Sequence, residues 1–173
     1  MTYSGKFVIT KQDNIQYNYF RMKRKLGGLA IMTFVILGVL VMLIRYGQGI
    51  SVMNAGTVGL IAAVTGAVLM VAFNLISVQV RVNNHYKKGE MADFSVQYSI
   101  DRDGVHVKSE RGDTNFTWKM IYLARETKDA IYLIAGEKRA VVIPKAQIAS
   151  ESELETLRSL LRKYVAAGRA KVA

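Results

Sequence analysis

The 173-residue chain contains no cysteine, one proline, one tryptophan and two histidines. Without cysteine it can form neither disulfides nor thiolate metal sites, and it has no cysteine nucleophile. The histidines, His85 and His106, have no partner at metal-ligand or catalytic spacing in the sequence. No glycine-rich phosphate loop, H-E-x-x-H or G-x-S-x-G motif occurs either. We therefore expect a non-enzymatic protein without a cofactor or metal.

Acidic residues are also scarce, with 13 Asp and Glu against 24 Lys and Arg, for a formal charge of +11. The excess is uneven. Residues 91–173 carry fourteen basic and eleven acidic residues, whereas residues 1–25 carry six basic residues and one Asp. Most of the excess therefore lies beside hydrophobic segments, which favours membrane topology over nucleic-acid binding as its cause.

Charge is absent altogether from residues 26–44, a run of nineteen residues. A helix of that length reaches ~28 Å, close to the ~30 Å hydrocarbon core of a bilayer. A second uncharged run, residues 46–80, predicts a second span over about 56–78. We expect a transmembrane helical hairpin over residues 26–80. No small-residue cleavage site follows the first span, so we expect it to be retained and not removed as a signal peptide.

The hairpin has basic residues at both outer ends and only Arg45 near its connector. Lys and Arg accumulate on the cytoplasmic side of membrane proteins. We therefore predict a multi-pass protein of the inner (plasma) membrane with both termini in the cytoplasm. No ionisable side chain lies within either span, so ion and proton relays are not expected.

Small residues recur at four-residue spacing in the second span, where they would let helices approach closely in lipid. We expect them to pack the two spans of one chain together, with a dimer face as the alternative. The positions concerned are Gly59, Ala63, Gly66 and Ala67.

Residues 1–25 predict a short strand near Lys6–Thr10 followed by an interfacial amphipathic helix. Thr10 and Asp13 have the spacing of a helix start. The aromatic residues Tyr17, Tyr19 and Phe20 suit the lipid headgroup region, but they could equally pack on a soluble domain.

Residues 81–173 predict a cytoplasmic α+β domain. Apolar residues alternate from Phe94 to Ile100, and turn residues then separate further strands near 105–107, 116–120, 122–126, 130–135 and 140–144. We expect Trp118 in the third of these strands and Pro144 at the end of the last. Ser150 and Glu153 have the spacing of a capping box, and a leucine-striped helix follows.

The order of these features resembles the YcxB-like family of bacterial membrane proteins. The matching features are the two-span hairpin, residues 98–104 (YSIDRDG), Trp118 followed by Ile121, residues 142–145 (VIPK) and the leucine-striped helix. The resemblance implies a six- or seven-stranded antiparallel pleckstrin-homology-like sandwich or barrel, closed by the C-terminal helix. The resemblance implies no catalytic residue.

Binding is then the expected function, with membrane lipids and another protein as partners and an unknown oligomeric state. We expect the candidate contacts to be cations near two turns, although a merely solvated surface explains them as well. They are Lys108, Arg111, Lys138, Arg139 and Lys145. Alternatives are an immunity protein against a membrane-active toxin or bacteriocin, and a lipid-directed enzyme using Asp93 with His85.

Overall fold

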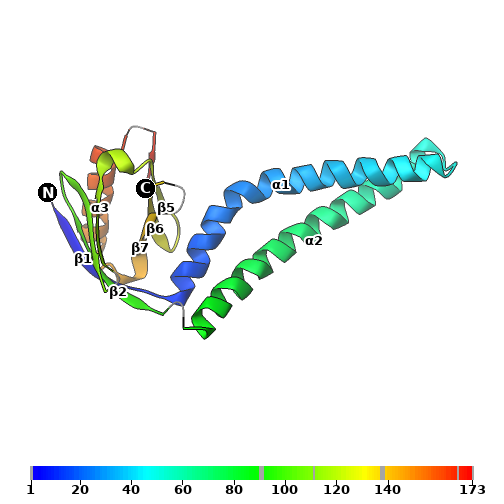
Figure 1. The fold of residues 1–173 in the computed structure, drawn as a ribbon. Helices are drawn as coiled ribbons and strands as arrows, with labels where there is room; N and C mark the ends of the chain where they lie inside the picture. Colours follow the sequence, from blue (N-terminus) through cyan, green and yellow to red (C-terminus); the bar gives the residue numbers. More distant parts are fainter. Residues whose placement is uncertain (1, 90–91, 111, 137–138, 167, 173) are drawn as a thin grey trace. The chain divides into compact units, whose positions relative to one another are not determined.

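The structure is a computed structural model that describes residues 2–89, 92–110, 112–136, 139–166 and 168–172, with Arg24 described by its backbone alone. The chain divides into two compact units. A helical unit comprises Ile15–Lys88, and a β-rich unit comprises Met1–Asn14 together with Gly89–Ala173. The β-rich unit is therefore built from chain segments on both sides of the helical one (Figure 1).

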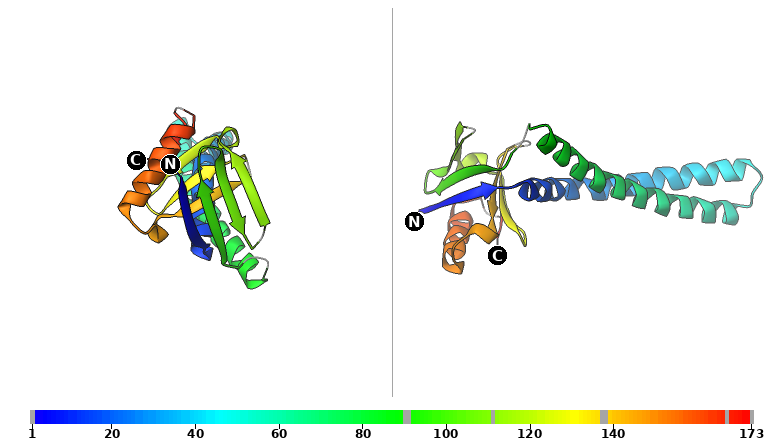
Figure 2. Two further views of the ribbon diagram at one scale, coloured as in Figure 1. Left: turned by 90° about the vertical axis from the view of Figure 1, so that its left-hand side faces the viewer. Right: turned by 90° about the horizontal axis from the view of Figure 1, so that it is seen from below.

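Two long helices, α1 (Lys11–Gly47) and α2 (Val52–Lys87), form the helical unit and run side by side in opposite directions (Figure 2). Within them, Lys25–Gly47 and Val52–Lys87 are long and apolar enough to cross a membrane. The predicted interfacial helix and first span are one continuous helix, α1, which begins at Lys11. Both helices expose large apolar side chains over much of their length, as a lipid-facing surface would require.

The first sheet of the β-rich unit is an antiparallel meander in the order β1-β2-β3-β4. Its strands are β1 (Tyr3–Ile9), β2 (Phe94–Ile100), β3 (Gly104–Ser109) and β4 (Gly112–Thr117). Strand β1 pairs with β2 over its whole length, from Tyr3 opposite Ile100 to Ile9 opposite Phe94. The alternation of apolar residues in both strands explains this register, because it turns both apolar sets toward one face.

The second sheet has the order β7-β6-β5-β8. Its strands are β5 (Leu123–Glu126), β6 (Ala130–Ile134), β7 (Ala140–Pro144) and β8 (Ala170–Lys171). Every residue of β6 is buried, which fits its central place in this sheet.

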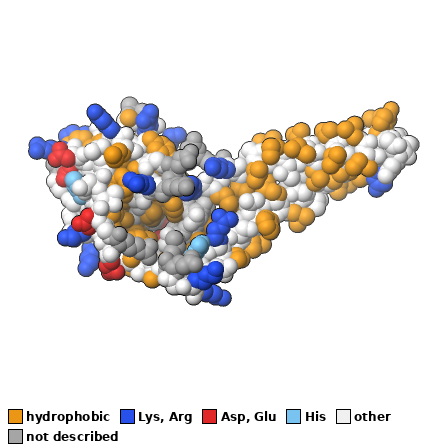
Figure 3. All heavy atoms as spheres, viewed as in Figure 1, with side chains coloured by type: hydrophobic (Ala, Val, Ile, Leu, Met, Phe, Trp, Pro, Cys, Tyr) orange, Lys and Arg blue, Asp and Glu red, His pale blue; other side chains and the backbone are white. Residues whose placement is uncertain are grey.

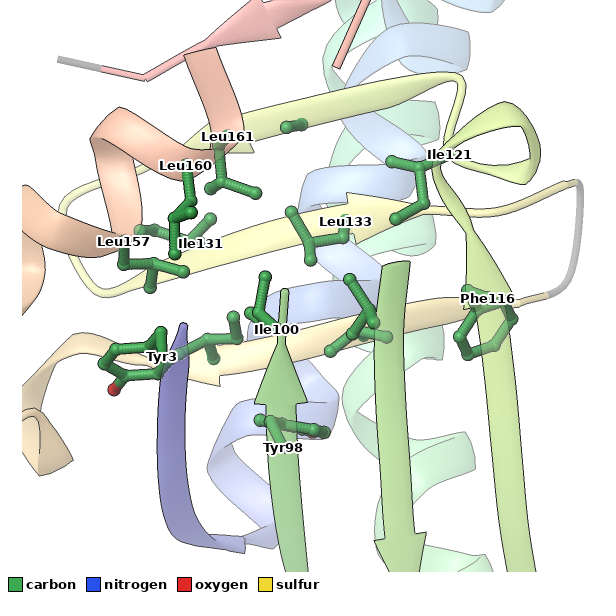
Figure 4. Close-up of a cluster of buried hydrophobic side chains, with 14 of the residues drawn as sticks. Tyr3, Tyr98, Ile100, Phe116, Ile121, Ile131, Leu133, Leu157, Leu160 and Leu161 are labelled. Atoms are coloured by element: carbon green, nitrogen blue, oxygen red, sulfur yellow. The ribbon is translucent and has the colours of Figure 1, made fainter. Parts of the chain in front are cut away.

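Helix α3 (Glu151–Tyr164) covers the space between the sheets with its leucine stripe. The backbone N–H of Glu153 donates to Ser150 Oγ at 3.2 Å, so Ser150 caps the helix as predicted. Leu157, Leu160 and Leu161 are fully buried and point toward the strands (Figure 4). One hydrophobic core thus joins β1, both sheets and α3.

The predicted sequence of membrane-type helices, β-rich region and C-terminal helix is confirmed, but its details need correction. The described residues form eight strands in two four-stranded sheets and no closed barrel, where a sandwich or barrel of six or seven strands was expected. The pairing of β5 with β8 is parallel, not antiparallel. The apolar pattern gave no sign of β8, because this two-residue strand has no buried face.

Trp118 was also predicted wrongly, as a strand residue. It begins a 3₁₀ helix, η1 (Trp118–Met120), directly after β4. The indole Nε1 donates to the carbonyl oxygen of Asp101 at 3.0 Å, and the ring stacks on Tyr164 with centroids 5.3 Å apart. Trp118 thus lies after the strand and packs against Tyr164 of α3.

Candidate functional site

The cations predicted as contacts are not equivalent in the structure. Lys108 and Arg139 are exposed to solvent. Lys145 is half-buried, and its Nζ lies 2.6 Å from Glu126 Oε1. Arg111 and Lys138 lie outside the described residues. Lys145 is thus part of an internal ion pair and is not an open site for a partner.

Glu126, at the end of β5, is the centre of that ionic cluster. Its side chain is only 7% exposed and accepts from Arg158 Nη2 at 2.7 Å and Nε at 3.0 Å, besides Lys145. These hydrogen bonds to Glu126 raise the pKa of Arg158, and the surface carboxylates of Glu151 and Glu155 act in the same direction. The cluster joins β5, α3 and the 3₁₀ helix η2 (Lys145–Gln147), so its role is to hold these elements together.

A second polar cluster lies at the hairpin between β2 and β3. Asp101 Oδ1 accepts from the backbone N–H groups of Asp103 and Gly104, at 2.8 and 3.2 Å, and these bonds, with a contribution from His106, lower the pKa of Asp101. His106 Nε2 lies 3.4 Å from Asp101 Oδ2, and its Nδ1 lies 3.0 Å from Asn115 Oδ1. Both ring nitrogens are therefore engaged, which leaves neither directed at a ligand.

Sequence reasoning missed the partners of His106. The available signal was the hairpin register, which places His106 directly opposite Asn115 across β3 and β4. Among the residues that the structure describes, no group of three or more His, Asp and Glu could hold a metal ion.

Asp93 and His85, the pair considered for lipid chemistry, belong to different units. Asp93 Oδ1 accepts from the backbone N–H of Lys11 at 2.8 Å, at the beginning of α1. Thr10 and Asp13 exchange the reciprocal hydrogen bonds of a capping box at the same helix start. Asp93 therefore has a structural partner of its own.

The small residues of α2 lie against α1. A Cβ atom built on Gly59 would come within 2.7 Å of the Gly38 carbonyl oxygen, and one built on Gly66 would overlap the Leu37 side chain. Ala63 is buried and Ala67 is half-buried. Contact between the two helices of one chain therefore uses the face that contains Gly59, Ala63 and Gly66.

Basic side chains gather at the outer ends of the two long helices. Residues 11–25 and 76–88 together hold eight Lys and Arg and one acidic residue, Asp13. No Asp or Glu occurs anywhere from residue 15 to residue 88. Figure 3 shows basic side chains beside the C-terminal end of α2, where the apolar surface of the helices ends.

Comparison with known proteins gives two matches. The model of the YcxB-like protein family matches residues 100–161, which run from the end of β2 into α3. The YcxB protein of Bacillus subtilis (strain 168) is 25% identical over 97 residues, which cover 56% of this chain and 52% of that protein. The match thus spans about half the length of that relative.

No solved structure matches the chain. Residues 100–161 include Trp118, Ile121, residues 142–145 and most of the leucine-striped helix, which are among the features that carry the resemblance. The matches confirm that the chain resembles the YcxB-like family, through a YcxB-like domain at residues 100–161.

Proposed function

We propose that the protein is a non-enzymatic integral membrane protein that presents its YcxB-like domain at the cytoplasmic face of the plasma membrane. In this proposal α1 and α2 cross the bilayer as a hairpin. The β-rich unit then binds a partner near the membrane surface.

The observation that carries this proposal is the pairing of β1 with β2. Seven residues before the hairpin pair with seven residues after it, and Tyr3, Phe7 and Ile9 contribute to the core of the unit. Two segments of one folded core must lie on the same side of a membrane. Two crossings between them satisfy that requirement, and an odd number would not.

The charge distribution supports the cytoplasm as that side. Near the connector between the helices the only basic residue is Arg45, in the last turn of α1, whereas the opposite helix ends carry eight Lys and Arg. The basic ends of short flanking segments stay in the cytoplasm. The exposed apolar surface of both helices supports contact with lipid in between.

The interaction role rests on the architecture of the β-rich unit. A four-stranded antiparallel meander, three further antiparallel strands and a C-terminal helix correspond in outline to a pleckstrin-homology-like arrangement. Such domains hold headgroups or peptides between their loops. Lys108 and Arg139 are the exposed candidates for this contact among the described residues.

The topology can be tested by cysteine labelling, because the chain has no cysteine of its own. Ser51, beside the connector, and Ser152, in α3, are both exposed, and Ser→Cys changes little in size. In intact cells a membrane-impermeant maleimide should label the Ser51→Cys variant and spare the Ser152→Cys variant. Ser152→Cys should become labelled only after the inner membrane is permeabilised.

Labelling of Ser152→Cys in intact cells, or recovery of the protein in the aqueous fraction without detergent, would contradict the proposal. The interaction role needs a separate measurement. Cross-linking in native membranes should recover a protein partner from the wild type and less of it from a Lys108→Gln/Arg139→Gln variant.

A further inference from the structure

We propose that one face of α2, near its C-terminal end, binds a single anionic phospholipid of the cytoplasmic leaflet. Its acyl chain would lie along Phe73, Ile76 and Val80, and its phosphate against Arg81, His85 and Lys88. This site rests on the proposed membrane location of the hairpin, and it adds a defined ligand to it.

The apolar half of the site is an exposed strip on α2. Phe73 is 71% exposed, Ile76 60% and Val80 49%, and their spacing of three and four residues places them on one side of the helix. The strip is about 10 Å long at the rise of an α-helix. In water such a strip would be unfavourable, whereas an acyl chain covers it without exposing it to solvent.

The polar half continues the same face. The surface of α2 is hollowed along the apolar strip and then along Arg81, Asn84, His85 and Lys88. The spacing of these four residues again follows one helix face. Arg81 and Lys88 are exposed, so each can reach a phosphate oxygen, and Asn84 adds an amide donor between them.

The surrounding charge favours an anion. The helical unit, Ile15–Lys88, contains no Asp or Glu, so α2 has no carboxylate of its own that competes for these cations. The acidic residue of α1, Asp13, lies before that unit and accepts from the Thr10 hydroxyl. The change from apolar to basic surface along one helix face matches the change from acyl chain to phosphate in a lipid molecule. A soluble phosphate would use only the basic half, which is why the apolar strip points to a lipid.

The test is lipid retention, measured by native mass spectrometry on the full-length protein after its transfer from membranes to detergent. The probes are phosphatidylglycerol and phosphatidylcholine with identical acyl chains. We expect the wild type to retain one phosphatidylglycerol per chain, bound at least tenfold more tightly than phosphatidylcholine. Arg81→Gln/Lys88→Gln should weaken phosphatidylglycerol about 30-fold, about fivefold for each cation removed.

The matched control is Lys23→Gln/Lys25→Gln, which removes two exposed cations from α1 instead. It should keep the affinity for phosphatidylglycerol within threefold of the wild type. Phe73→Ala should weaken the binding of phosphatidylglycerol, and glycerol phosphate at millimolar concentration should not displace the lipid.

Three results would overturn the site: equal retention of both lipids, equal losses in the two double variants, or displacement by glycerol phosphate. The last would mean that the basic half binds a free phosphate without the apolar strip. Each can occur with the protein still in the membrane. If the protein is not in the membrane as proposed, the cysteine-labelling experiment shows it independently of lipid retention.

Discussion

Tyr98 shows how one buried polar group fixes the distance between the two sheets. It extends from β2 and is 3% exposed, and its hydroxyl donates to the carbonyl oxygen of Val142 in β7 at 2.9 Å. Burial raises the pKa of Tyr98 above the ordinary value of 10.0, because the ionised phenol would lose its hydration.

We predict that this group makes stability fall at high pH. The pKa of Tyr98 is higher in the folded than in the unfolded chain. The contribution of the neutral Tyr98 to stability is therefore complete below pH 10 and is lost as the pH rises above it, where the unfolded chain ionises first. The free energy of unfolding should decrease by up to about 1.4 kcal/mol per pH unit for this group. Denaturant unfolding between pH 8 and pH 11 should show the decrease.

Tyr98→Phe is the control for that prediction. It should cost about 1 kcal/mol at pH 8, through the lost hydrogen bond, and should flatten the dependence above pH 10. If the free energy of unfolding of Tyr98→Phe falls as steeply with pH as that of the wild type, another group causes the loss of stability. Tyr3 is the first candidate, because burial also raises its pKa.

Gly104 is a second residue with a definite structural requirement. It starts β3 with φ of +155°, and a Cβ built on it would overlap the carbonyl oxygen of Phe116 in β4. We predict that Gly104→Ala destabilises the β-rich unit by about 2–4 kcal/mol, since backbone has to move. Thermal unfolding measures the loss.

Gly112→Ala separates the effect of the positive φ from that of the contact with Phe116. Gly112 also has a positive φ, +117°, but its chain neighbours aside, no atom of the described residues lies within 4 Å of the added Cβ. It should therefore cost about 1–2 kcal/mol from the backbone alone. Equal losses at both glycines would show that the contact with Phe116 contributes nothing.

Residue-level prediction from sequence succeeded where the interaction is local. The Thr10–Asp13 and Ser150–Glu153 pairs are three residues apart, and in both the backbone N–H of the second residue donates to the hydroxyl of the first, as expected. The Glu126–Arg158 bonds join residues 32 apart, and the indole bond of Trp118 reaches back 17 residues. No periodic pattern encodes partners at such separations, so both were missed.

At the scale of elements, the outer edge of β1 has a side-chain partner instead of a neighbouring strand. Gln147, in η2, accepts from the Val8 N–H and donates to the Val8 carbonyl oxygen, both at 2.8 Å. The amide thus makes the two bonds that a paired strand would make. It protects an edge that could otherwise pair with another chain.

We predict that Gln147→Ala destabilises the protein by about 0.5–1.5 kcal/mol, because water reaches exposed Val8 and replaces part of both bonds. It should also increase concentration-dependent association in size-exclusion chromatography. Gln97→Ala, at an exposed glutamine of β2, should change neither property. If both variants associate, protection of the β1 edge by Gln147 does not explain the association.

The contact between the two long helices yields the next prediction. Gly59→Ala should destabilise the hairpin by about 1–3 kcal/mol, because the new methyl group meets the backbone of Gly38. Gly56→Ala has no atom within 4 Å of the new Cβ and should be neutral or stabilising by up to about 1 kcal/mol. Unfolding of the hairpin in detergent micelles compares the two.

If Gly59→Ala is as stable as Gly56→Ala, the close approach of the helices is not needed for the hairpin.

The existence of the helices and of most strands was predictable from sequence, because apolar periodicity and turn residues indicate them directly. The place where β4 ends at Thr117 and the parallel β8 were not, because tertiary contacts determine both.

At the scale of the whole molecule, the β-rich unit is discontinuous in sequence. Its two parts come together at the start of α1, where the Lys11 N–H donates to Asp93 Oδ1 at 2.8 Å. A few residues could therefore connect them. We predict that replacing residues 15–88 with a short Gly/Ser linker yields a soluble, cooperatively folding unit.

A chain of residues 92–173 alone is the comparison. Lacking β1, it loses Tyr3, Phe7 and Ile9 from the core and exposes the edge of β2, so it should aggregate or lack dispersed amide signals in NMR spectra. A folded fragment without β1 would show that the N-terminal strand is dispensable. The sequence indicated a strand near residues 6–10, but its pairing partner, about 85 residues away, required the structure.

The distance between paired strands also has a consequence for biosynthesis. Ile9 leaves the ribosome long before its partner Phe94 has been made. At about 5–20 residues per second, roughly 4–17 seconds pass between the synthesis of Ile9 and that of Phe94, where β2 begins. Both long helices are translated during that interval. With the proposed topology, the N-terminal strand can therefore pair with β2 only after the whole hairpin has been synthesised.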